Sequence, residues 1–339
     1  MTTAGCNKND GGPRIALTGA TGFLGSHIAD TLLERGYRVR ASIRATSNQQ
    51  WLAGKPVETV EIDLTSTEDC RRFLDRTSGL IHCAGVVNAP TEEIYWQANV
   101  TTCATLLEAA AQRWAGHGET AAFVLISSLA AHGPASVEQP AVETDPCRPI
   151  TAYGRSKLAA EKLLDADRWP FRTAILRPPA LYGPRDREFL SLFSLALRGW
   201  SGRIGRSMTG LSLVHGRDAA TAAVDLLETG TACGPYFVDD GQAGYNWQAL
   251  AKVLGQMAGR RVRLLPVPLG LLKITSRLIG SRRAARSVVL NWDRILDLES
   301  CGWVCRGDKL AADTGFRARY DAVAGFADTL DFYRKEGWL

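Results

Sequence analysis

The sequence lacks several features that would each have indicated a particular class of protein. No apolar run approaches the roughly 20 residues that cross a bilayer, and the first dozen residues lack the apolar core of a signal peptide. The eight cysteines include no CxxC pair, and the five histidines do not gather near the only close pair, Cys301 and Cys305. We therefore expect a cytoplasmic protein with reduced thiols and no metal site.

A large excess of charge of one sign is also missing. The 40 Lys and Arg residues against 35 Asp and Glu leave a formal net charge of +5, and the basic residues are scattered along the chain. This pattern predicts no nucleic-acid partner. A chain of 339 residues, 45% of them hydrophobic, is long enough to bury a sizeable core, and it shows no internal repeat. Residues 1–13 are expected to form a disordered tail.

A glycine-rich link at residues 18–25 (TGATGFLG) joins a short apolar run to a helical pattern. In such a link Gly19 permits a tight turn, Gly22 lets the backbone approach a phosphate, and Gly25 lets the helix pack closely on the strand. The start of the helix then offers unpaired N–H groups to an anion. The sequence therefore predicts a dinucleotide site.

Predicted strands alternate with predicted helices through most of the chain. Apolar runs predict strands at residues 14–17, 37–43, 57–62, 80–85 and 121–126, and helical patterns predict helices at 23–35, 92–114 and 153–166. Because the strands are continuously apolar, we expect an α/β fold with a Rossmann-type, doubly wound parallel sheet. The C-terminal third predicts a small α/β substrate lobe, with strands at 235–239 and 262–266 and helices at 247–257 and 322–335.

The end of the second predicted strand bears on the choice between NADP and NAD. An NAD site usually places an acid about 20 residues beyond the glycine loop, to hold the ribose 2′-hydroxyl. Here the segment Ser42-Ile43-Arg44 contains no acid, and Arg40 lies just upstream. Since a guanidinium suits a 2′-phosphate, Arg44 favours NADP(H), with NAD as the alternative. In the other interpretation Arg44 is simply a solvated residue at a strand end.

Tyr153 and Lys157 lie four residues apart at the start of a predicted helix, so their side chains share one face. A phenol ordinarily titrates near pH 10, which is too high for a base at neutral pH. A neighbouring ammonium favours the phenolate and so suits Tyr153 for proton transfer. Ser128, at the end of the fifth predicted strand, completes a candidate catalytic set.

Several separate motifs now carry a family resemblance. They are the glycine loop, Asp63-Leu64, His82–Gly85, Asn99-Val100, the set Ser128, Tyr153 and Lys157, Arg177–Pro184 and Val214–Asp218. The chain resembles the extended short-chain dehydrogenases/reductases, in the epimerase/dehydratase branch that includes 3β-hydroxysteroid dehydrogenases and dihydroflavonol reductases. The resemblance spans roughly residues 14 to 338.

The resemblance implies a role for each catalytic residue. Tyr153 would exchange a proton with the substrate oxygen, Ser128 would donate a hydrogen bond to that oxygen, and Lys157 would hold the nicotinamide ribose and tune Tyr153. The cofactor-binding residues implied by the loop and the family motifs are Thr18, Gly19, Thr21, Gly22, Phe23, Leu24, Gly25, Arg44, Asp63, Leu64, Cys83, Ala84, Gly85, Asn99, Ser127, Pro178, Ala180 and Leu181.

The resemblance also implies a division of the chain. Residues 14–180 would form the NAD(P)-binding domain, with segments near 211–240 returning to it. Residues 181–210 and 241–339 would form the substrate lobe. Many relatives pair the helices at 92–114 and 151–166 across a dimer interface, so we expect a homodimer.

Departures from the family pattern bear on the substrate. Sugar dehydratases of this family carry an Asp–Glu pair after the catalytic serine, whereas Leu129 and Ala130 follow Ser128 here. Nucleotide-sugar epimerases tend to carry an arginine near Leu211 and an asparagine at the position of Ala180. Both losses remove partners of a sugar diphosphate, although Arg185, Arg187, Arg203 and Arg206 are candidate substitutes.

These departures favour an NADP(H)-preferring oxidoreductase that interconverts a secondary alcohol and a ketone on a mainly apolar small molecule. One alternative is a nucleotide-sugar or other sugar epimerase that uses the same catalytic set with a tightly bound NAD(P). Another is a non-catalytic, cofactor-sensing protein, which would need no proton donor.

Three further stretches each allow a functional and a structural interpretation. Residues 189–195 and 265–272 are candidates for the walls of an apolar pocket or for ordinary core. Residues 274–289 form a basic amphipathic pattern that suits either weak contact with a membrane surface or a solvated helix face. His132 is either a substrate contact or a structural histidine.

Overall fold

The computed structural model describes residues 12–116, 121–204, 209–267, 296 and 300–339. Its centre is a seven-stranded sheet in which every pair is parallel. The strands are β1 (Arg14–Thr18), β2 (Arg38–Ile43), β3 (Val57–Glu61), β4 (Gly79–His82), β5 (Ala122–Ile126), β6 (Arg172–Arg177) and β10 (Gly234–Phe237). Their order, β10-β6-β5-β4-β1-β2-β3, reverses direction between β1 and β4. Doubly wound sheets bind ligands at such a reversal, outside the carboxyl ends of the strands.

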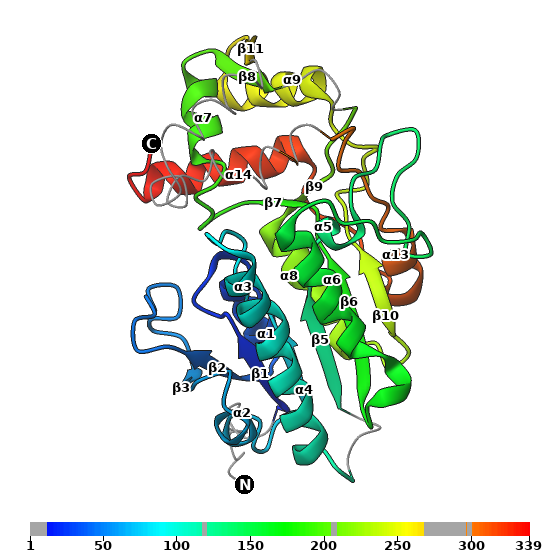
Figure 1. The fold of residues 1–339 in the computed structure, drawn as a ribbon. Helices are drawn as coiled ribbons and strands as arrows, with labels where there is room; N and C mark the ends of the chain where they lie inside the picture. The colour runs from blue at the N-terminus through cyan, green and yellow to red at the C-terminus, as the bar shows by residue number, and fades with distance from the viewer. Residues whose placement is uncertain (1–11, 117–120, 205–208, 268–295, 297–299) are drawn as a thin grey trace, which may run out of the picture.

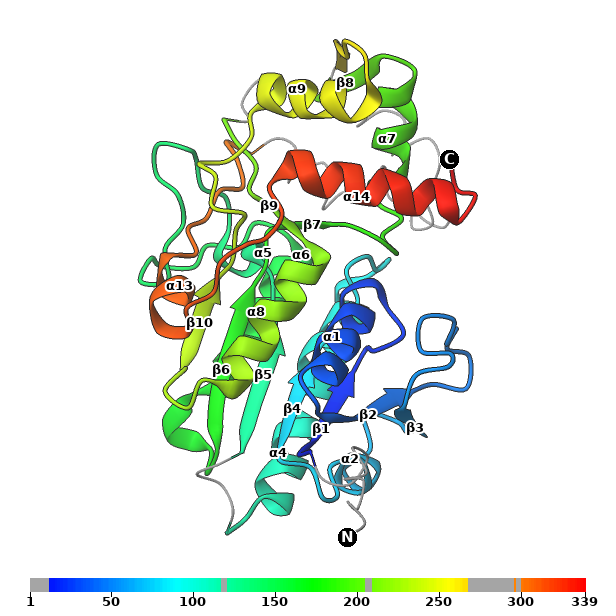
Figure 2. The ribbon, with the colours of Figure 1, turned by 180° about the vertical axis from the view of Figure 1, so that it is seen from behind.

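Helices cover both faces of this sheet (Figures 1 and 2). One face packs against α1 (Phe23–Glu34), α8 (Gly216–Glu228) and α13 (Asp308–Thr314), whose buried residues join those of β1 and β5 in one core cluster. The other face packs against α2 (Thr67–Phe73), α4 (Thr102–Arg113) and α6 (Ala152–Glu161). Because both faces are buried at the centre of the sheet, β5 (AFVLI) is a continuous apolar run, whereas β2 (RVRASI) and the edge strand β3 (VETVE) contain charged residues.

A smaller lobe lies beyond the carboxyl ends of the strands, at the top of Figure 1. It consists of α7 (Leu190–Leu197), β8 (Trp200–Ile204), α9 (Trp247–Ala258), β11 (Arg263–Val267) and α14 (Ala322–Lys335). Its core is aromatic: Tyr182, Phe193, Phe326 and Tyr333 are fully buried, and the Phe193 ring lies 5.1 Å from that of Phe326. The short strands β7 (Ala180–Tyr182) and β9 (Leu213–His215) pair with each other between the sheet and the lobe.

Local signals explain where several helices begin. The side chains of Thr151, Asn246 and Asp321 accept backbone N–H bonds at the starts of α6, α9 and α14. Helix α9 ends at Gly259, whose left-handed conformation (φ +64°) suits glycine.

The expected α/β fold, with a Rossmann-type doubly wound sheet, is confirmed, and the differences from the predicted elements are local. The predicted helix at 92–114 is α3 (Glu92–Tyr95), a π-helical segment η1 (Trp96–Thr101) and α4. The predicted helix at 153–166 is α6 followed by the 3₁₀ turns η3 (Lys162–Leu164) and η4 (Ala166–Arg168). Strand β8 and the short helix α5 (Leu129–His132) were not predicted, and β8 pairs in parallel with β11.

Two predictions concern the ends of the described segments. The predicted tail lies outside the described residues except for Gly12 and Pro13, whose carbonyls accept hydrogen bonds from Arg38. The basic pattern at 274–289 lies outside them entirely. Among the described helices, none has both the length and the apolar character needed to cross a membrane.

Candidate active site

The glycine loop between β1 and α1 turns tightly because glycines stand where a side chain would clash. Gly19 has φ +73°, and a Cβ there would lie 2.7 Å from the Ala84 nitrogen. A Cβ on Gly25 would lie 2.1 Å from the Gly19 carbonyl oxygen. The Gly22 N–H donates to the same carbonyl at 3.0 Å. The loop therefore folds tightly, and the N-terminus of α1 opens beside β4, where a dinucleotide fits.

The ends of β1 and β4 are joined at the point where the sheet order reverses. Thr18 Oγ1 lies 2.7 Å from His82 Nδ1, and the Ala84 N–H donates to Thr18 Oγ1 at 3.0 Å. Burial lowers the pKa of His82 to about 3, so this ring is neutral near pH 7. The bonds fix the course of Cys83, Ala84 and the following glycine at the carboxyl edge of the sheet, beside the glycine loop.

Asn99 connects the segment that follows β4 to helix α6. Its Oδ1 accepts the Val86 N–H at 2.9 Å, and its Nδ2 donates to the Val86 carbonyl at 3.2 Å and to Ser156 Oγ at 2.9 Å. Asn99 lies in the π-helical segment, an irregularity that is frequent at functional sites. A Cβ on Gly85 would lie 2.8 Å from Asn99 Oδ1 and 3.3 Å from Lys157 Nζ, so only glycine fits there.

The three candidate catalytic residues lie on two neighbouring elements. Ser128 follows β5 and caps α5, where its Oγ accepts the Ala130 N–H at 3.1 Å. Tyr153 lies in the first turn of α6, and its ring centroid is 5.9 Å from that of Tyr95. Lys157, one turn later, is 6% exposed and donates through Nζ to the Ile126 carbonyl at 2.9 Å.

Burial lowers the pKa of Lys157 below its usual value. The bond to the Ile126 carbonyl points this ammonium toward the end of β5, beside Gly85 and Asn99. A proton donor, a hydroxyl donor and a fixed cation around one carbonyl oxygen are what hydride chemistry on a ketone requires.

A buried ion pair between Glu161 and Arg177 lies next to the candidate catalytic residues on α6. The sequence analysis did not predict this pair. Glu161 lies one turn after Lys157 and accepts hydrogen bonds from Arg177 at 2.6 Å and from Ser127 Oγ. Both charged side chains are almost fully buried, and Arg177 Nη2 also donates to Cys147 Sγ. Ser127, predicted as a cofactor contact, thus ties β5 to α6. The sequence does show that Glu161 follows Lys157 by four residues and therefore lies on the same face of the helix.

The remaining predicted cofactor residues follow the carboxyl ends of strands of the sheet. Arg44 is exposed at the end of β2, whereas Arg40 is held by Glu58 and the carbonyls of Arg72 and Asp75. Asp63 follows β3, and two hydrogen bonds from Thr65 lower its pKa. Thr21, Phe23, Leu24 and Leu64 lie in the loop, in α1 and after β3, and Pro178, Ala180 and Leu181 lie in and just before β7.

On the substrate side, two of the four arginines named as candidate partners of a diphosphate are engaged elsewhere. Arg185 donates to Ser26 Oγ at 3.0 Å and to Asp30 at 2.7 Å, and the Arg187 guanidinium stacks 4.2 Å from the Trp338 ring. Arg203 lies in β8, on the side of the small lobe that is remote from the sheet, as Figure 1 shows, and Arg206 lies outside the described residues.

Most of the apolar stretch at 189–195 serves as core, whereas Leu265 of the second stretch is 47% exposed. Phe193 is fully buried, and Phe189, Leu190 and Leu192 pack against the small-lobe cluster, which also takes up Leu211. His132 is buried, its Nδ1 lies 3.1 Å from the Gly133 carbonyl, and its ring meets the Phe237 ring edge-on; these contacts suit the structural interpretation. The last residues of the 265–272 stretch lie outside the described residues.

Known proteins resemble this chain in sequence and in fold. Residues 15–236 match the model of the NAD dependent epimerase/dehydratase family. The chain belongs to this family. It is 30% identical over 328 residues to a ceramide reductase of Caulobacter vibrioides, with 96% of each chain covered.

Two further relatives show the range of the family. A 4-hydroxy-2-methyl-3-oxo-4-farnesyl-3,4-dihydroquinoline-1-oxide ketoreductase of Stigmatella aurantiaca is 27% identical, covering 67% of this chain and 68% of that one. The UDP-glucose 4-epimerase of Thermus thermophilus, solved with NAD, has a TM-score of 0.75 at 23% identity, covering 95% and 99% of the chains. The protein is thus an NAD(P)-dependent enzyme of the extended short-chain dehydrogenase/reductase type, a family with oxidoreductases and epimerases.

Proposed function

We propose that this enzyme uses NADPH to reduce a ketone to a secondary alcohol on a long-chain, lipid-like molecule. The observation that carries the proposal is the loss of diphosphate partners: Leu211 packs in the core, and Arg185 and Arg187 are bound elsewhere. Similarity to a ceramide reductase along 96% of the chain supports the same substrate class.

The chain's own groups account for the proton and the charge. The Tyr153 hydroxyl gives its proton to the ketone oxygen, and Ser128 Oγ donates a hydrogen bond to that oxygen as its negative charge develops. Lys157, fixed by the Ile126 carbonyl, holds the ribose and keeps positive charge beside the tyrosine. The bound nicotinamide supplies the hydride. Leu129 and Ala130 cannot move a second proton, so an elimination step has no base.

The preference for NADPH rests on Arg44. It is exposed at the end of β2, and no described acid forms an ion pair with it, so its guanidinium is free to meet a 2′-phosphate. The same strand end carries no acid for the 2′-hydroxyl of NAD.

The epimerase remains the second candidate, because the same three residues serve it and its solved relative has the same fold. The two candidates differ in cofactor balance: a reductase consumes NADPH, whereas an epimerase returns the hydride to its substrate. A homodimer is also part of the proposal, since Ile94 and Trp96 are exposed on the segment joining α3 to η1.

The test incubates the purified protein with NADPH and either an N-acylated long-chain β-keto amine or UDP-glucose. We expect loss of nicotinamide absorbance and a new alcohol with the lipid alone. Formation of UDP-galactose without a net change in cofactor would contradict the proposal. Sedimentation of the same preparation tests the dimer, and a single species of 36.8 kDa would exclude it.

A further inference from the structure

The far end of the small lobe has an unusual distribution of charge. Residues 189–204 and 241–267, which contain α7, β8, α9 and β11, hold six Arg and Lys residues and no Asp or Glu. The whole chain, by contrast, carries 35 acidic residues among 339. The net charge of the protein is modest, but the charged residues within 189–204 and 241–267 are all basic.

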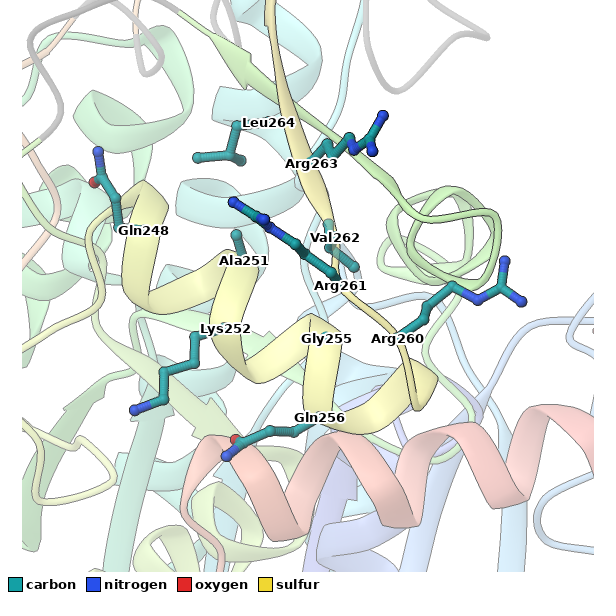
Figure 3. A pocket seen from close by; sticks show the side chains of 10 residues that line it. All are labelled: Gln248, Ala251, Lys252, Gly255, Gln256, Arg260, Arg261, Val262, Arg263 and Leu264. Atoms are coloured by element: carbon teal, nitrogen blue, oxygen red, sulfur yellow. The ribbon is translucent and has the colours of Figure 1, made fainter.

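A groove between α9 and β11 gathers most of these cations (Figure 3). It encloses about 660 Å³, and its lining includes Lys252, Arg260, Arg261 and Arg263, all four exposed. Within the part of the chain that the structure describes, no carboxylate forms an ion pair with any of the four. Their charges are thus available to an external anion.

The same end of the small lobe exposes large apolar side chains from α7, β8 and β11. Trp200, Leu195 and Leu265 are 38%, 44% and 47% exposed. Trp200 pairs with Arg263 in the β8–β11 ribbon, and its ring lies 5.7 Å from that guanidinium. Leu265 lies two residues after Arg263 and so shares its face of the ribbon, opposite Gly202, which has no side chain to cover it. One face thus combines indole, leucine and arginine.

We propose that this end of the small lobe, residues 189–204 and 241–267, docks on the surface of an anionic lipid bilayer. Exposed cations attract acidic headgroups, while tryptophan and leucine side chains enter the boundary between headgroups and acyl chains. A nucleic acid would satisfy the cations but leave Leu195 and Leu265 in water. The inference does not depend on the proposed reaction, because it concerns where the protein binds and not what it converts.

The first test measures co-sedimentation of the full chain with vesicles. We expect binding to vesicles that contain phosphatidylglycerol, weakened by salt, and no binding to pure phosphatidylcholine. The variant R260Q/R261Q/R263Q should bind about tenfold more weakly or worse, since each cation near an acidic surface contributes attraction. The control R71Q/R113Q/R168Q changes the charge equally on α2, α4 and η4, and should bind like the parent.

The second test separates a bilayer from a soluble polyanion. W200S/L265S changes two exposed side chains, so its thermal midpoint should match that of the parent. We expect it to lose vesicle binding and to keep its retention on heparin. Three results would overturn the proposal: no binding to acidic vesicles, equal weakening in the control, or heparin retention without vesicle binding.

Discussion

The cofactor half and the small lobe are built by opposite means. Around the ends of β1, β4 and β5, nearly every polar group has a named partner, as in the bonds that join Thr18 to His82 and Asn99 to Ser156. The small lobe relies on buried rings such as Phe193 and Phe326, and no described carboxylate forms an ion pair with Lys252, Arg260, Arg261 or Arg263 at its outer end. The cofactor half is thus organised by hydrogen bonds between polar groups, and the small lobe by apolar packing, with no acid in residues 189–204 and 241–267.

This difference explains why the reaction type of the enzyme is easier to predict from the sequence than its substrate. A hydride transfer needs particular groups at particular distances, which leave a motif in the sequence. An apolar substrate needs mainly shape and the absence of charge, and many sequences supply both.

Replacing Tyr153 by Phe removes the proposed proton donor and should lower the rate of ketone reduction by about 10²- to 10⁴-fold. Binding of NADPH, followed by protein fluorescence, should stay within twofold of the parent, about 0.4 kcal/mol. Tyr95→Phe is the matched control, because its ring lies 5.9 Å away on another element. A Tyr153→Phe enzyme with the parent rate would place the chemistry elsewhere.

Adding one methyl group to the glycine loop should disrupt the cofactor half. In Gly25→Ala the new Cβ meets the Gly19 carbonyl at 2.1 Å, so the loop must shift, at a cost of about 1–3 kcal/mol in unfolding free energy. Cofactor affinity should fall with it. Gly230→Ala adds the same methyl group where nothing lies within 4 Å and should leave both quantities unchanged. Equal effects in the two variants would remove the special role of the loop.

The cofactor preference should change with a single side chain. Arg44→Gln deletes a charge-assisted bond to a 2′-phosphate, so NADPH should bind about 10- to 100-fold more weakly while NADH binding stays the same. Arg38→Gln, at the other end of β2, serves as the control. If Arg44→Gln weakened NADPH and NADH equally, Arg44 would have no part in choosing between them.

A buried histidine should make stability depend on pH. Burial beside Arg185 lowers the pKa of His27 to about 3, so below pH 6.5 the unfolded chain takes up a proton that the folded protein refuses. Stability is then lost as the pH falls, by up to about 1.4 kcal/mol per pH unit from this group.

Urea unfolding of the parent and of His27→Gln between pH 7 and 5 measures that loss. We expect a flatter dependence in the variant. Asp186, whose pKa burial raises to about 6, acts in the opposite direction but is present in both proteins and cancels in the difference. Identical slopes would show that His27 titrates normally in the folded state.

Local pattern was enough to predict much of the cofactor half. The strand at 122–126 starts within a residue of its predicted bound, because a buried parallel strand is a continuous apolar run. The strand at 38–43 also starts within a residue of its predicted bound, although it carries Arg38 and Arg40. The spacing of Tyr153 and Lys157 on one helix face was likewise visible, since it depends only on helical periodicity.

Other features depend on contacts between distant residues and could not be predicted. The π-helical segment at Asn99 has the same apolar pattern as the helix around it. The bond of Arg185 to Asp30 spans 155 residues of sequence. Strand β8 pairs with β11, from which β9, α8, β10 and α9 separate it in the sequence. The spacing of Glu161 from Lys157 on α6 was visible in the sequence. Its partner Arg177 comes from strand β6, and that contact could not be predicted.

The most direct test of the central claim follows one atom. NADPH carrying deuterium at both C4 positions of the nicotinamide is incubated with the enzyme and an N-acylated long-chain β-keto amine, and the alcohol is analysed by mass spectrometry. We predict one deuterium on the new carbinol carbon, the same labelled alcohol formed about 10²- to 10⁴-fold more slowly with Tyr153→Phe, and no conversion of UDP-glucose under the same conditions. An unlabelled alcohol, or UDP-galactose formed without consumption of NADPH, would contradict the account.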